Sequence, residues 1–71
     1  MNLTDITLDQ RTEALRYIHK IRNHNKRAYA ICFYEHAFGR GPQPKRDDHG
    51  LSMMGAQAVQ IRLLEILGGC Q

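Results

Sequence analysis

The chain has 71 residues, of which 42% are hydrophobic and 24% are charged, and its formal net charge is +3. This length allows a single domain, residues 1–71, with a core near the lower limit of what stabilises one chain. Two cysteines are too few for a disulfide scaffold, and the mildly basic charge excludes neither a protein partner nor a nucleic acid.

The start of the chain and its hydropathy indicate a cytoplasmic protein. The first ten residues, MNLTDITLDQ, lack the basic and apolar regions of a signal peptide. No segment approaches the roughly 18 to 20 continuous apolar residues of a membrane span. We therefore expect a protein of a reducing cytoplasm, with no membrane association.

Residues 8–38 are predicted to form one long helix. Thr7 and Gln10 have the spacing of a capping box, and apolar residues recur behind them at helical intervals. No glycine or proline occurs before Gly39, although residues 23–25 allow a kink and Asn25 can cap a second helix. Such a helix would be about 46 Å long, so part of it would extend beyond its own core.

A loop and a shorter second helix are predicted to follow. Residues 39–50, GRGPQPKRDDHG, are rich in glycine and proline, and Ser52 can cap a helix over about 52–67. The predicted fold is therefore all-α: a helical hairpin whose excess apolar surface favours a homodimeric helix bundle. The positions expected in the core or the dimer interface are Leu15, Ile18, Ile21, Tyr29, Phe33, Val59, Leu63, Ile66 and Leu67.

No catalytic or metal-binding motif is present in the sequence. Cys32 and His36 are four residues apart, but further ligands would have to come from His49, Cys70 or an acidic residue. A cysteine in so apolar a run is usually a buried structural thiol. The same pair lacks the third group that nucleophilic catalysis needs. We predict that the protein is not an enzyme and binds no metal or cofactor.

The run RYIHKIRNHNKR, residues 16–27, carries no acidic residue. On one continuous helix its bases would form a ridge that could bind phosphates, contact a protein, or simply be solvated. The last helix carries a single base, Arg62, and therefore does not suit the reading of a DNA groove. The alternative function is a small nucleic-acid-binding transcriptional regulator that uses the ridge Arg16, Lys20, Arg22, Lys26 and Arg27.

The aromatic run AYAICFYEHAF, residues 28–38, lies directly before the loop. Its aromatic side chains suit a core or a dimer interface. Tyrosine and arginine are also enriched at the binding hot spots of protein interfaces. A partner-binding patch is therefore predicted where this run meets the loop, with Tyr34, Phe38, Arg40, Lys45 and Arg46.

A resemblance to known proteins rests on residues 25–52, NKRAYAICFYEHAFGRGPQPKRDDHGLS, and on the short apolar helix after them. This part of the chain resembles small early proteins of transposable bacteriophages that disarm host regulators. The resemblance covers the organisation of most of the chain and is above all to the quorum-sensing anti-activator family, related in character to phage twitching-motility inhibitors. It implies a dimeric helical protein in the host bacterial cytoplasm. The implied host target is a LuxR-type quorum-sensing transcription regulator or the type IV pilus assembly ATPase, and no contact residue is implied.

Overall fold

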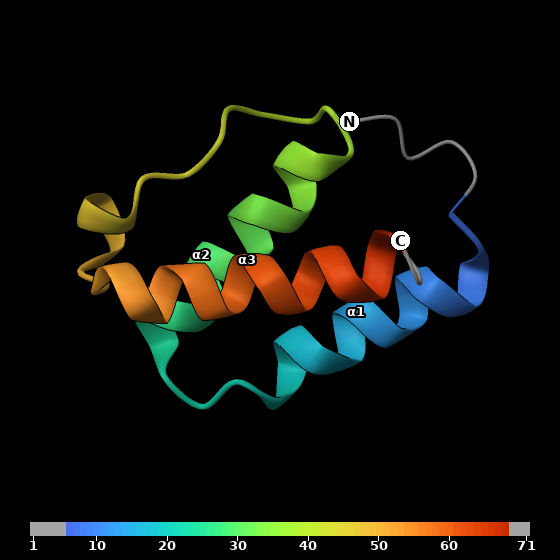
Figure 1. Ribbon diagram of the computed structural model, residues 1–71, viewed down its shortest axis with the longest axis horizontal. Helices are drawn as coiled ribbons and strands as arrows, with labels where there is room; N and C mark the ends of the chain where they lie inside the picture. The colour runs from blue at the N-terminus through green and yellow to red at the C-terminus, as the bar shows by residue number, and fades with distance from the viewer. Residues whose placement is uncertain (1–5, 69–71) are drawn as a thin grey trace.

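The computed structural model describes residues 6–68. This part of the chain contains no strand, and its elements, in chain order, are α1 (Leu8–Lys20), α2 (His24–Ala37), the short 3-10 helix η1 (Arg46–His49) and α3 (Met53–Gly68). The predicted all-α class is confirmed (Figure 1). Cys70, considered above as a metal ligand, lies outside the described residues.

Helix α1 begins with the predicted capping box. The Thr7 hydroxyl accepts from the backbone N–H of Gln10 at 3.1 Å, and the Gln10 side chain accepts from the Thr7 N–H at 2.8 Å. The same Gln10 amide also lies 3.4 Å from the carbonyl oxygens of Ile66 and Leu67. One residue therefore caps α1 and ties its start to the end of α3.

The predicted single helix over residues 8–38 is wrong, because the chain leaves the helical conformation between Lys20 and His24. Ile21 and Asn23 are both extended, and the Asn23 side chain caps α2 by accepting from the Lys26 N–H at 2.9 Å. The Arg27 guanidinium donates to the Ile21 carbonyl at 3.1 Å, so this carbonyl has a hydrogen-bond partner within the break. The cap is Asn23, and Asn25 lies inside α2.

Compactness explains why the break is favoured. A straight helix over residues 8–38 would be about 46 Å long, whereas the longest extent of the folded chain is 32 Å. The bend lets α1 and α2 both pack against α3, which runs antiparallel to α1 (Figure 1). The helix–loop–helix order of the prediction is present, with its first arm divided in two.

The loop between α2 and α3 contains more structure than predicted. Its last part forms η1, which ends at Gly50 in the left-handed conformation, with φ of 66°. Ser52 then caps α3, as predicted, by accepting from the Gly55 N–H at 3.0 Å. The observed helix, Met53–Gly68, differs from the predicted range by one residue at each end.

The core lies where α3 crosses the other two helices. Ala14 and Ile18 come from α1, and the remaining buried residues are Tyr29, Ala30, Phe33, Tyr34, Ala56, Val59, Leu63 and Leu67. Six of the nine positions predicted for the core or dimer interface are among them. Ile21 and Ile66 are half-buried and pack against this cluster.

Leu15 lies outside the core of the single chain, because 41% of it is exposed, and its place in a dimer interface stays a prediction. The face of α1 that contacts α3 is centred on Ala14 and Ile18, and Leu15 lies about 100° around the helix from Ala14. The predicted apolar stripe included every apolar residue at helical spacing. It is therefore broader than the face of α1 that is buried in the single chain.

Some large apolar side chains remain uncovered. Met53, Met54 and Ile61 on α3 are 66%, 81% and 54% exposed. Leu8 and Ile31 on the other helices are exposed as well. The homodimer that this surplus favours stays a prediction. Within residues 6–68, no helix is long and apolar enough to cross a membrane.

Candidate partner-binding site

The C-terminal turn of α2 begins the candidate site. Gly39, with φ of 73°, follows Phe38, and its N–H donates to the His36 carbonyl at 2.9 Å. The Arg40 N–H donates to the Glu35 carbonyl, also at 2.9 Å, which completes a Schellman motif. Glycine is favoured at this turn because a side chain strains the left-handed conformation. The motif reverses the chain and places Arg40 beside Phe38.

Two arginines flank the ring of Phe38, one from α1 and one from the loop. The guanidinium carbon lies 4.9 Å from the ring centroid for Arg11 and 5.7 Å for Arg40. The Tyr34 ring packs against Phe38 at 4.8 Å. Neither arginine forms an ion pair with another described residue. We call Arg11, Phe38 and Arg40 the arginine–aromatic cluster; its chemistry suits a carboxylate next to an apolar group.

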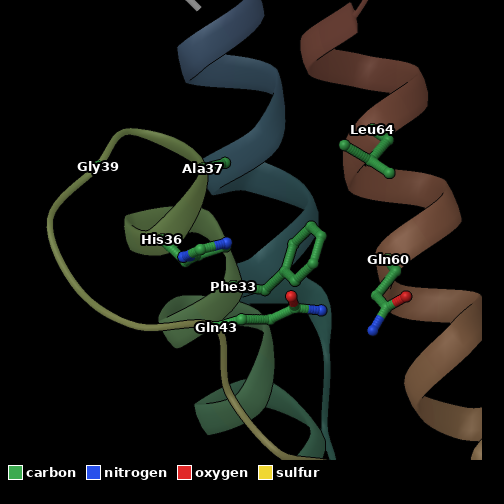
Figure 2. A pocket seen from close by; sticks show the side chains of 7 residues that line it. All are labelled: Phe33, His36, Ala37, Gly39, Gln43, Gln60 and Leu64. Atoms are coloured by element: carbon green, nitrogen blue, oxygen red, sulfur yellow. The ribbon is translucent and has the colours of Figure 1, made fainter. Parts of the chain in front are cut away.

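A pocket lies between α2, the loop and α3, beside this cluster. Its volume is about 330 Å³. Figure 2 shows Phe33 and Gln43 extending from α2 and the loop toward Gln60 and Leu64 on α3. The residues that line it are Phe33, His36, Ala37, Gly39, Gln43, Gln60 and Leu64. We call this space the α2–α3 pocket.

The polar groups of the α2–α3 pocket are uncharged amides and an imidazole. The Gln60 amide donates to the Tyr29 hydroxyl at 2.6 Å, which holds that side chain at the pocket. His36 Nδ1 lies 2.9 Å from the Gly41 carbonyl oxygen. Because a carbonyl can only accept, this contact is a hydrogen bond when Nδ1 carries the proton. No lysine, arginine, aspartate or glutamate lines this pocket.

A second hollow of about 380 Å³ lies along the same loop and has a different chemistry. Arg40 and Lys45 line it together with Glu35 and Asp48, so both charges are present. Gln43 lines both hollows. The loop therefore lines two hollows, of which only the second contains lysine, arginine, aspartate or glutamate side chains.

The predicted patch is only partly brought together. Phe38 and Arg40 are neighbours, and Arg40 shares the charged hollow with Lys45. Arg46 instead donates to the Leu51 carbonyl at 3.3 Å and pairs with Asp47 at 3.2 Å, which holds the base of the loop. The prediction that Tyr34 belongs to the partner-binding patch is wrong, because only 8% of it is exposed. It lies in the core, where its ring packs against Phe38.

Sequence reasoning missed three residues of the site. Arg11 lies far from Phe38 in the sequence, and only the packing of α1 beside α2 brings them together. Gln43 and Gln60 come from the loop and from α3. A glutamine carries no sequence signal that distinguishes a pocket residue from an ordinary surface residue.

The predicted basic ridge does not run along one continuous helix, because the chain breaks between α1 and α2. Arg16 and Lys20 lie on α1, Arg22 lies in the break, and Lys26 and Arg27 lie on α2. The broken helix therefore divides these bases over three segments. Some also have local partners: Arg16 pairs with Glu13, and Arg27 donates to the backbone of the break.

The two residues considered for metal binding have other surroundings. His36 contacts Gly41, and the half-buried Cys32 lines the charged hollow. Over residues 6–68, no three side chains of histidine, cysteine, aspartate or glutamate come together as a metal site.

Comparison with known proteins does not identify a relative: no family model, curated protein or solved structure matches this chain.

Proposed function

We propose that this protein is a non-enzymatic helical protein that binds a larger protein and inhibits it. The observation that carries the proposal is the arginine–aromatic cluster, in which two arginines without an acidic partner among the described residues lie over the Phe38 ring. Aromatic and arginine side chains supply a large share of the binding energy at protein interfaces. Inhibition would follow from covering a surface that the target needs.

The resemblance of residues 25–52 to phage host-takeover proteins suggests the target. A LuxR-type quorum-sensing regulator is the first protein to test, and the type IV pilus assembly ATPase is the second. The phage origin and the host cytoplasm as the site of action are part of the same proposal. Free arginines at the site would favour an acidic patch on the target, because complementary charges accelerate association and select the partner.

Binding assays with purified target test this proposal. The double variant Arg11→Gln, Arg40→Gln removes both charges from Phe38, and we expect it to weaken binding at least tenfold. Lys20→Gln, Arg22→Gln is the matched control, because both residues are exposed and lie outside the cluster. Circular dichroism establishes that both variants are folded. Unchanged affinity of the cluster variant, or no binding of either target by the natural protein, would overturn the proposal.

The nucleic-acid alternative has a separate test. Because binding to phosphates falls steeply with salt, a gel-shift titration with DNA and RNA at low salt is the most sensitive assay. Salt-dependent binding that is lost in the Lys20→Gln, Arg22→Gln variant would favour the alternative.

A further inference from the structure

The α2–α3 pocket and the arginine–aromatic cluster adjoin along the chain. Gly39 lines the pocket, and its neighbours Phe38 and Arg40 belong to the cluster. Consecutive Cα atoms are about 3.8 Å apart, which is also the spacing of residues in a bound segment. A partner segment that passes over Gly39 would contact both places.

The pocket itself suits an uncharged occupant. Phe33, Ala37 and Leu64 provide apolar surface, whereas no lysine, arginine, aspartate or glutamate lines it. Its volume, about 330 Å³, is at the lower end of the range for ligand pockets. A single large apolar side chain with its peptide unit fits this description, and a phosphate or carboxylate would find no cation inside.

The amides at the pocket match the peptide unit of such an occupant. Gln43 is exposed and makes no hydrogen bond with the described residues. Gln60 uses one N–H for Tyr29, which leaves its second N–H as a donor and its amide oxygen as an acceptor. Each carboxamide offers a donor and an acceptor, as a backbone peptide unit does, so the two can pair.

The positive charge of the arginine–aromatic cluster indicates which partner residue would lie beside the apolar one. Arg11 and Arg40 carry positive charge at Phe38 without an acidic partner among the described residues. A carboxylate placed there gains charge-assisted hydrogen bonds, whereas a cationic residue would be repelled. We propose that the α2–α3 pocket binds one aromatic or leucine-sized side chain of an extended partner segment, and that an adjacent acidic residue binds Arg40 and Arg11.

This inference rests on the proposed function, since it names the kind of segment that the partner presents. It can be tested without the partner by NMR titration of the full ¹⁵N-labelled chain with the blocked peptide Ac-Asp-Phe-Asp-NH₂, to about 10 mM. We expect the side-chain amide signals of Gln43 and Gln60 to shift. The peptides Ac-Asp-Gly-Asp-NH₂ and Ac-Lys-Phe-Lys-NH₂ should bind at least tenfold more weakly.

A pair of glutamine variants sharpens the test. Gln43→Ala should weaken binding of Ac-Asp-Phe-Asp-NH₂ about fivefold, the effect of one hydrogen bond. Gln57→Ala is the control, because Gln57 is equally exposed but does not line this pocket, and it should leave binding unchanged.

The outcomes separate this inference from the proposed function. Absence of shifts at Gln43 and Gln60, or equal binding of the phenylalanine and glycine peptides, would overturn the pocket inference even if the purified target binds. Peptide binding with the expected preferences would support the pocket inference even if neither proposed target binds, a result that would overturn the proposed function.

Discussion

The break between α1 and α2 depends on Asn23, and replacing this residue tests the break directly. In Asn23→Ala, the Lys26 N–H loses the side-chain oxygen that accepts from it at 2.9 Å. Removal of an N-cap side chain costs about 0.5–2 kcal/mol, and the exposure of Asn23 favours the middle of this range, about 1 kcal/mol. For a domain of this size, that loss lowers Tm by about 4–8 °C.

Thermal denaturation followed by circular dichroism at 222 nm measures the effect. Asn25→Ala is the matched control, because Asn25 is also exposed but lies inside α2 and does not cap it. We expect the control to change the free energy of unfolding by less than about 0.5 kcal/mol. Asn23→Asp keeps the capping oxygen and adds a negative charge at the helix N-terminus, so it should preserve stability.

Two results would refute this reasoning. Equal destabilisation by Asn23→Ala and Asn25→Ala would show that the side-chain cap does not explain the loss. An unchanged Tm together with a stronger helical signal in Asn23→Ala would show that residues 8–38 readily form one helix, and the compact arrangement of α1 and α2 would then need another cause.

Three further predictions concern the core, a tyrosine and the loop. Leu63 is fully buried, so Leu63→Ala should lower the free energy of unfolding by about 2–5 kcal/mol in urea denaturation, and a loss below about 1 kcal/mol would contradict the core described above. Burial raises the pKa of Tyr17 above its ordinary value of 10.0, with the charge of Arg62 opposing the shift. Because the folded state favours the neutral phenol, this contribution to stability is present below pH 10.0 and is lost as the pH rises through the folded-state pKa. Relative to Tyr17→Phe, the natural protein should therefore lose stability above that pH, and parallel pH profiles would contradict the expectation. Gly50→Ala should cost about 1–2 kcal/mol because φ is 66°, whereas Gly41→Ala, which has open space and no positive φ, should be close to neutral in the same assay.

The N-terminal ends of α1 and α3 could be predicted because they depend on residues close together in the sequence. The capping box of Thr7 and Gln10 and the cap at Ser52 need only three-residue spacings, and both are present. The buried face of α3 follows from helical periodicity as well, since Val59, Leu63 and Leu67 recur at intervals of four. Local spacing and periodicity therefore located these elements.

The break at residues 21–23 was not predictable with the same certainty. A sequence without glycine or proline is compatible with a continuous helix, and Asn23 is only a modest interruption by itself. Whether the helix breaks depends on α3, because both α1 and α2 bury side chains against it once the chain bends. The same bend divided the predicted basic ridge.

The candidate site shows which features depend on the local sequence and which depend on tertiary structure. By itself, the sequence determined an all-helical chain with a glycine- and proline-rich loop and an aromatic run before it, because these properties depend on local conformational preference. Only the tertiary structure decided that Tyr34 is buried, that Arg11 joins Arg40 at Phe38, and that Gln43 and Gln60 line the same pocket. These contacts join residues distant in the chain, and they form because the helices bury a common core.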